Sequence, residues 1–167
     1  MHHDVVIRTP EHCSEEERVA FIALAERSAE VRRPDLESGF DRARFLLWTN
    51  DARGLTGVSA LKIPRSSYRE RVFAEAKCNL HCQDYPLEFG YLYVEEDRRD
   101  QGYGTTLVDR TLQLAESDGV FATTRETNEV FHPFLTKRGF VRAGERCKSK
   151  RGDFWLLLFV RSGAERR

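Results

Sequence analysis

The sequence lacks several features that would place it in a special class. Charge of one sign is not in excess, since 27 basic residues balance 27 acidic ones for a formal net charge of zero. A general nucleic-acid surface needs a basic excess, so no nucleic-acid partner is expected. The longest apolar run, Trp155–Val160, is far too short to span a bilayer, and no membrane partner is expected. The N-terminal stretch also lacks the basic and apolar regions of a signal peptide.

Cysteine is scarce as well. Four cysteines in a chain of 167 residues do not suggest the disulfide framework of a small secreted domain, so a cytoplasmic location is expected. Cys78, His81 and Cys82 could supply three zinc ligands. No second Cys/His pair has the spacing to complete the site. The segment is therefore interpreted as a polar loop with free thiols, and no metal is expected.

The composition is otherwise that of an ordinary globular domain. Hydrophobic residues make up 40% of the chain and charged residues 32%. A chain of this length can build one proper core. Residues 1–167 are therefore expected to form a single domain, which acts as a monomer or a homodimer.

The most informative stretch runs from Leu87 to Leu107. Its first part, up to Val94, is rich in aromatic and branched residues and predicts a buried strand. Charged residues over 97–100 end that strand, and Gly102 and Gly104 then precede a segment with helical apolar spacing. Glycine lets backbone N–H groups face an anion closely, and a helix start adds the positive end of its dipole. The stretch therefore predicts a phosphate cradle between a strand and a helix.

The glycine spacing excludes two common kinds of cradle. A dinucleotide-binding fingerprint needs a third glycine and an acidic residue about 20 positions further on, and a Walker loop needs Gly-Lys followed by Ser or Thr. Neither pattern occurs here, so a nucleotide-binding regulator fits poorly. Judged on the loop alone, a turn capped by glycine is an open alternative.

The rest of the chain predicts a mixed sheet with helices between its strands. Strands are predicted at Asp4–Arg8, Phe45–Thr49, Leu55–Ile63, Leu87–Val94, Val120–Thr124, Val141–Cys147 and Asp153–Arg161. Helices are predicted from Ser14 to Val31, over Ser67–Ala76, over Thr105–Ser117 and from His132 to Gly139, with a further helical turn within Asp35–Arg44. Ser14 and Ser67 each begin a capping-box pattern, and Pro34 is expected to end the first helix. The predicted fold class is α+β with one mixed, mostly antiparallel sheet.

Three separated matches relate the sequence to a known family. Arg99, Gly102 and Gly104, after a strand that ends Tyr-Val-Glu-Glu, resemble motif A of the GNAT N-acetyltransferases. Asn128 and the segment 134–140 resemble the Asn and Phe-Tyr-Glu-Lys-x-Gly-Phe pattern of the same family. The order of the predicted elements also resembles the GNAT fold from end to end, with the Ser67–Ala76 helix as an extra element.

The third match is Glu88, which lies six residues before Val94, where histone-acetylating members carry their base. The resemblance implies direct transfer of an acetyl group from acetyl-CoA, as co-substrate, to an amine. A lysine-like amine has a pKa of about 10.4, so roughly one molecule in a few thousand is neutral at pH 7 and a base is useful. Six strand residues span roughly 20 Å, which favours a base that acts through water. A carboxylate in a salt bridge at a sheet edge is the alternative for Glu88.

The resemblance also implies roles for the loop. The backbone N–H of Val94 would polarise the thioester carbonyl. The pyrophosphate of coenzyme A would bind the N–H groups of Gln101, Gly102, Tyr103, Gly104 and Thr105. Arg99 would add charge, or serve only as a solvated surface residue. Asn128 would bind the pantetheine arm, or cap the helix that follows.

One position departs from the family pattern. Leu135 stands where many members carry a tyrosine that protonates the departing CoA thiolate, and leucine cannot donate a proton. His132 lies one helical turn earlier, and Tyr91, Tyr93 or water are further candidates. An alternative function is thus a CoA-binding sensor or interaction module with little or no activity. The acceptor is an amine on a small molecule, a peptide or a protein, and the sequence does not identify it.

Overall fold

A computed structural model of the protein describes residues 3–164. The strands of this part of the chain are β1 (Val5–Arg8), β2 (Ala43–Asp51), β3 (Gly54–Lys62), β4 (Leu87–Val94), β5 (Val120–Arg125), β6 (Val141–Lys148) and β7 (Trp155–Arg161). The α-helices are α1 (Glu15–Glu26), α2 (Arg33–Asp41), α3 (Ser66–Glu75), α4 (Tyr103–Leu114) and α5 (Phe131–Thr136). Single 3₁₀ turns lie at Pro10–His12, Cys82–Asp84 and Glu96–Arg98.

Within the described residues, the strands form one seven-stranded mixed sheet in the order β1-β2-β3-β4-β5-β7-β6. Neighbouring strands are antiparallel in the pairs β1–β2, β2–β3, β5–β7 and β6–β7, and parallel in the pair β4–β5. The predicted α+β class with a mostly antiparallel mixed sheet is therefore confirmed. The strands predicted at Phe45–Thr49 and Leu55–Ile63 correspond to β2 and β3, which form an antiparallel hairpin around a tight turn.

The structure divides into two compact units. The first unit comprises residues 3–63 and 89–114, and the second comprises residues 64–88 and 115–164. The chain passes between them within β4, whose Leu87 and Glu88 belong to the second unit. Each unit is described below on its own.

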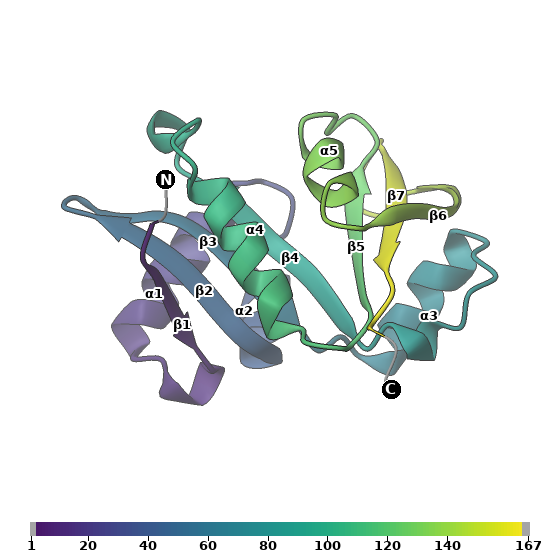
Figure 1. Cartoon of the computed structure of the whole chain (residues 1–167), viewed down its shortest axis with the longest axis horizontal. Coiled ribbons are helices and arrows are strands. Elements are labelled where there is room, and N and C mark those ends of the chain that lie inside the picture. The colour runs from purple at the N-terminus through teal and green to yellow at the C-terminus, as the bar shows by residue number, and fades with distance from the viewer. Residues whose placement is uncertain (1–2, 165–167) are drawn as a thin grey trace. The chain divides into compact units, whose positions relative to one another are not determined.

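In the first unit, strands β1–β3 lie between helices on both faces (Figure 1). Alternation along β3 sends Val58 and Ala60 into the hydrophobic cluster formed with α1 and α2, while Ser59 bonds Thr111 of α4 through their hydroxyls at 2.8 Å. Close packing of α4 depends on Gly57, because a Cβ there would lie 2.8 Å from Leu107. The α4 helix is thereby fixed directly on β3.

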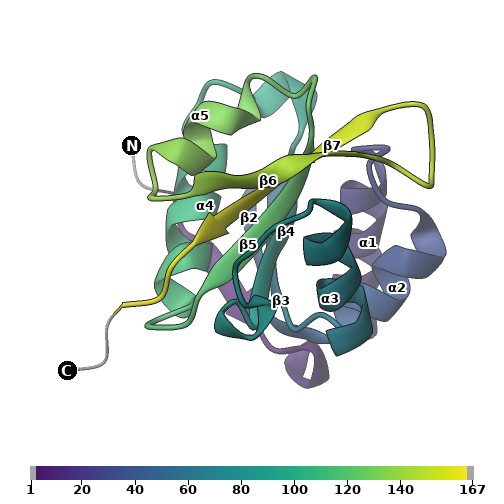
Figure 2. The ribbon, with the colours of Figure 1, turned by 90° about the vertical axis from the view of Figure 1, so that its right-hand side faces the viewer.

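In the second unit, α3 (dark teal, Figure 2) packs on strands β5, β6 and β7 through a separate hydrophobic cluster. Phe73 of α3 is buried in this cluster. The C-terminal end of α3 reaches β6, where the N–H of Glu145 donates to the carbonyl of Ala76 at 2.6 Å. Gly144, with φ +67°, allows this approach, because a Cβ there would meet the Ala76 carbonyl oxygen at 2.1 Å. The α3 segment is thus an integral part of the second unit.

The predicted end of the first helix is wrong. The first helix ends at Glu26, before Val31, and Pro34 lies in the first turn of α2 instead of ending α1. A proline fits there because the first-turn N–H groups have no partner within the helix. The predicted capping box at Ser14 is confirmed, since Ser14 and Glu17 bond each other's backbone N–H groups.

The second predicted capping box is wrong, because Ser67 lies inside α3 and the N-cap position is occupied by Arg65 without a side-chain bond. None of the helices within residues 3–164 is both long and apolar enough to cross a lipid bilayer.

Candidate functional site

The C-terminal end of β4 continues directly into the predicted phosphate loop. After Val94, the N–H of Glu95 donates to the carbonyl of Thr56 at 2.8 Å, which holds the strand end on β3. Arg99 then folds back, and its Nε donates to the carbonyl of Val94 at 3.2 Å. Its guanidinium lies 5.5 Å from the ring centroid of Tyr93. Arg99 therefore fixes the start of the loop against the strand, and its contact with phosphate stays a prediction.

The loop enters α4 through two glycines with different tasks. Gly102 has a φ of +88°, in the left-handed region that favours glycine, and its carbonyl accepts the first helical bond from Thr106 at 3.0 Å. Gly104 lies in the first turn of α4, and a Cβ there would be 3.7 Å from Val94 Cγ2. The first N–H groups of a helix have no acceptor within it. Val94 and the N–H groups of this first turn therefore lie side by side in one unit.

A buried arginine that the sequence analysis missed anchors this loop. Arg98 is only 8% exposed, and its Nε donates to Asp51 of the β2–β3 turn at 2.7 Å. Its Nη1 donates to Asp97. The bond to Asp51, followed by that to Asp97, raises the pKa of the Arg98 guanidinium above its ordinary value. No local pattern separates Arg98 from Arg99, because only the distant Asp51 decides which arginine is buried.

Two acidic groups just before the loop form ion pairs with further arginines. Glu95 pairs with Arg27 at the end of α1 at 2.6 Å, and Asp97 pairs with Arg53 at 3.6 Å. These ion pairs offset negative charge close to the predicted anion site. The electrostatic conflict between an acidic loop and a bound phosphate is thereby reduced.

We expect the Asp51–Arg98 pair to make the stability of the fold depend on pH in the acidic range. The hydrogen bond from Arg98 lowers the pKa of Asp51 below its ordinary value. A depressed carboxyl pKa stabilises the fold above the unfolded pKa of about 3.9, and this contribution is lost as the pH falls through the lower folded value. Asp51→Asn should therefore lower the melting temperature at pH 7, with a difference from wild type that shrinks below about pH 4.

Thermal unfolding followed by circular dichroism at pH 3 and pH 7 measures this effect. Asp41→Asn is the matched control, because that carboxylate is 64% exposed and pairs with Arg18 only at 3.5 Å. We expect the control to change the melting temperature little. A pH-independent difference for Asp51→Asn would contradict the assignment.

The second unit holds the predicted base. Glu88 is 3% exposed and pairs with Phe121 in the parallel β4–β5 ladder. The hydroxyl of Tyr68 in α3 donates to Glu88 Oε2 at 2.9 Å. Glu88 is therefore a buried, hydrogen-bonded carboxylate on an internal strand and not the exposed residue of a sheet edge. Its role as a base stays a prediction.

Asn128 follows β5 and is exposed. Its N–H donates to the carbonyl of Arg125 at 3.0 Å, and its carbonyl accepts from the N–H of Phe131 at 3.1 Å. The α5 helix begins after Val130, which occupies the N-cap position, so the alternative that Asn128 caps this helix is wrong. Its predicted contact with the pantetheine arm is untested.

Leu135, at the position of the missing tyrosine, and His132, a candidate proton donor, have different surroundings. Leu135 is completely buried, which is consistent with a packing role. The His132 ring lies 5.5 Å from the ring of Phe159, and its Nε2 is 3.1 Å from the carbonyl oxygen of Arg125. His132 is thus engaged in the fold of the second unit.

Regular alternation along a strand would place Gly90 and Tyr91 on opposite faces of β4, and this expectation is wrong at Tyr91. This residue has a φ of +59°, which is unusual for a non-glycine residue in a strand. Gly90 and Tyr91 both face Lys62, because a Cβ at Gly90 would lie 2.8 Å from Lys62 Cε, and the Lys62 ammonium is 4.4 Å from the Tyr91 ring centroid. Two successive residues on one side mark a β-bulge, so the regular alternation of faces is shifted beyond Gly90.

His3, which was not among the predicted site residues, also lies against the loop. The ring of His3 stacks on Tyr103 with centroids 3.7 Å apart, and its Nε2 lies 2.6 Å from the carbonyl oxygen of Gln101. The sequence analysis assigned no role to this N-terminal histidine. Its position beside the loop follows only from the path of the chain into β1.

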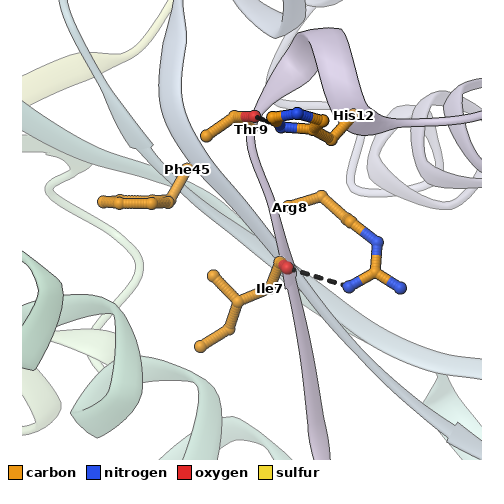
Figure 3. Close-up of a pocket in the computed structure, with 5 residues that line it drawn as sticks. All are labelled: Ile7, Arg8, Thr9, His12 and Phe45. Carbon is orange, nitrogen blue, oxygen red and sulfur yellow. Dashed lines mark hydrogen bonds between the residues drawn. The ribbon is translucent and has the colours of Figure 1, made fainter.

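A pocket of about 290 Å³ lies elsewhere in the first unit. Figure 3 shows its lining residues, Ile7, Arg8, Thr9, His12 and Phe45. Its polar groups bond one another, with Arg8 donating to the Ile7 carbonyl at 3.0 Å and Thr9 Oγ1 lying 2.6 Å from His12 Nδ1. None of these residues belongs to the predicted site, so the pocket is not the candidate site.

The cysteine-rich segment has a packing role. Cys82 is buried in the cluster beneath α3, and Cys78 packs against the same cluster. Over residues 3–164, no three or more His, Cys, Asp and Glu side chains gather to hold a metal ion. The absence of a structural metal in this segment stays a prediction.

Comparison with known proteins decides the family. The model of the acetyltransferase (GNAT) family matches residues 13–140, which is more than half of the chain. The chain belongs to the GNAT acetyltransferase family. No curated protein sequence matches it.

Solved structures show the GNAT fold. An acyl-CoA N-acyltransferase from Pseudomonas aeruginosa is 16% identical, with a TM-score of 0.68 over 96% of this chain and 99% of that one. The ribosomal-protein-S18-alanine N-acetyltransferase from Escherichia coli is 12% identical, with a TM-score of 0.70 over 98% and 97%. An aminoglycoside 6'-N-acetyltransferase complexed with coenzyme A is 14% identical, with a TM-score of 0.66 over 97% and 99%. At these identities the likeness establishes the fold and not the acceptor.

The GNAT family match covers the predicted phosphate loop, Glu88 and Asn128. Of these, the loop and Val94 belong to the first unit, whereas Glu88 and Asn128 belong to the second. Within the first unit, the predicted phosphate loop has a strand end, a left-handed glycine and a helix start in direct sequence.

Proposed function

We propose that this GNAT protein transfers an acetyl group from acetyl-CoA to an amine by direct attack of the amine. The observation that carries the proposal is the first-unit site, in which Val94, Gly102 and the first turn of α4 adjoin one another in a chain of this family. We further propose that residues 1–167 act as one acetyltransferase domain in the cytoplasm. The four cysteines are free thiols, which supports a reducing compartment.

The residues present fit a coenzyme A pyrophosphate. Gly104 has no Cβ, its nearest neighbour at that position would be Val94 at 3.7 Å, and the first-turn N–H groups lack acceptors within α4. The N–H groups of Gln101–Thr105 would hold the phosphates, and the positive end of the α4 dipole would add to the attraction. Arg99 would add charge to the same loop, and Asn128 would bind the pantetheine arm.

Acetyl-CoA would supply a thioester, whose C–S bond breaks as the amine nitrogen bonds the carbonyl carbon. The N–H of Val94 would stabilise the negative charge that develops on the carbonyl oxygen. Glu88 would accept the amine proton, directly or through water. The buried setting of Glu88 supports this role, since a carboxylate held away from bulk solvent and fixed by a donor is positioned for proton transfer.

A second candidate function rests on Leu135. Because this buried leucine offers no proton to a thiolate, a CoA-binding sensor with little activity is the alternative. The two functions share the phosphate loop and differ in turnover. Neither of the two candidate functions identifies the acceptor amine, which is carried by a small molecule, a peptide or a protein.

Release of free thiol from acetyl-CoA in the presence of an amine panel tests the proposal. The panel should contain polyamines, aminoglycosides and lysine peptides, and a reaction without amine corrects for hydrolysis. We expect amine-dependent thiol release together with an acetylated product in the mass spectrum. Binding of CoA by calorimetry without amine-dependent release would favour the sensor.

A further inference from the structure

The extra helix of this chain contacts the candidate base. Tyr68 lies in the first turns of α3, and its hydroxyl donates to Glu88 Oε2 at 2.9 Å. The two residues are 20 positions apart, and Glu88 is 3% exposed. A helix that is extra to the predicted fold thus supplies a side chain to the most buried acidic group of the candidate site.

Helix α3 is fixed at its far end. The Ala76 carbonyl that follows it accepts a bond from Glu145 of β6 at 2.6 Å. Two ion pairs reinforce this junction, Lys77 with Glu145 at 3.4 Å and Glu75 with Lys150 at 3.0 Å. The helix therefore cannot turn about its axis without breaking this backbone hydrogen bond.

The last turn of α3 also packs on the sheet, next to the strand partner of Glu88. The buried Phe73 ring meets the Phe121 ring edge-on, with centroids 5.5 Å apart. Phe121 is the residue paired with Glu88 across the β4–β5 ladder. Tyr68, five residues before Phe73 on the same helix, is thereby presented to the carboxylate by a rigid element.

We propose that Tyr68 is a positioning residue for acetyl transfer, whose hydroxyl fixes one oxygen of the Glu88 carboxylate so that the carboxylate is oriented to accept the amine proton. This inference rests on the proposed function, in which Glu88 is the base. A hydrogen bond from a hydroxyl to a carboxylate is short and directional. It also restricts the rotation of the Glu88 side chain. The base is then held by α3 and not by its own strand alone.

Tyr68→Phe removes only the hydroxyl and keeps the ring. We expect kcat to fall about tenfold, at the lower end of the contribution of a hydrogen bond to a charged group, while the KM for acetyl-CoA stays unchanged. Tyr85→Phe is the matched control, because Tyr85 is a buried tyrosine that packs on Phe73 of the same helix with centroids 5.6 Å apart. The control should keep the kcat of wild type, and thermal unfolding should show both variants folded.

A double-mutant cycle with Glu88→Gln separates positioning from a general packing effect. If Tyr68 acts through the carboxylate, Tyr68→Phe should change kcat less than twofold in the Glu88→Gln background. An equal loss in both backgrounds, or wild-type kcat for Tyr68→Phe in an active enzyme, would overturn the inference and leave the proposed function intact. Complete absence of amine-dependent turnover in wild type would instead remove the proposed function, and this inference with it.

Discussion

Glu88→Gln is expected to lower turnover by about 10²–10⁴-fold, the range typical of the loss of a general base. The glutamine keeps the size of the side chain and an oxygen that can accept the bond from Tyr68, so the packing around this buried position should persist. Affinity for acetyl-CoA should change little, because the predicted pyrophosphate contacts lie on the α4 loop. The loss should shrink as the pH rises, since a larger share of the amine is then already neutral.

A pH–rate profile of kcat for wild type and Glu88→Gln measures this effect, with CoA affinity determined separately by calorimetry. Glu126→Gln serves as the control, because Glu126 is a half-exposed carboxylate of the second unit that pairs with Arg146 at 3.1 Å. A Glu88→Gln profile that parallels wild type at every pH would remove Glu88 from the mechanism. A fall in CoA affinity of the same size as the fall in turnover would point to structural damage.

Gly104→Asp is expected to weaken CoA binding at least about tenfold, because a carboxylate would stand next to the phosphates in a partly desolvated site. The same substitution should not unfold the protein. A Cβ at Gly104 would have only an ordinary contact of 3.7 Å with Val94, and an acidic side chain in the first turn of a helix interacts favourably with the helix dipole. The affinity for CoA should therefore fall, whereas the melting temperature should not.

Calorimetric titration with CoA and thermal unfolding distinguish these two effects. Gly104→Asn has nearly the size of the aspartate without its charge, and Gly104→Ala tests the Cβ alone. We expect the affinity to fall in the order wild type, alanine, asparagine, aspartate, with the largest step at the charge. Unchanged CoA affinity in Gly104→Asp would disprove binding of the pyrophosphate at this helix start.

The elements that sequence predicted well are those with local causes. The Ser14 capping box formed because its two bonds join residues only three positions apart. Strand β4 was predicted from its run of aromatic and branched side chains, because these side chains suit the pleated, buried surface of a sheet. The loop before α4 was predicted from its glycines, because the backbone angles that glycine can adopt are a property of the residue itself.

The errors arose where a distant residue decides the local structure. Tyr91 adopts a left-handed angle inside a strand, and its packing depends on α2, where a Cβ at Gly39 would lie 1.8 Å from the Tyr91 hydroxyl. Arg98, and not its neighbour Arg99, is buried because Asp51 lies 47 positions away on the β2–β3 turn. Neither effect leaves a pattern within a window of a few residues.

The candidate site shows the same division. Sequence could name Glu88, Val94 and the glycines, because their spacing resembles a family motif. It could not find Tyr68, since the serine pattern beside it suggested only a helix start and gave no direction for the ring. The contact exists because α3 is attached at both Phe121 and Glu145, which are distant in sequence.

The attachment of α3 to β6 also bears on how the molecule meets other molecules. Strand β6 is the last strand of the sheet, and an outer strand normally offers its unpaired N–H and carbonyl groups to any passing chain. Here the register of β6 shifts between Ala143 and Cys147, and the N–H of Glu145 is already used by Ala76. A further strand therefore cannot add along the full length of this side. A redesign that removes the C-terminal end of α3 together with Ala76 would reopen this side and invite self-association.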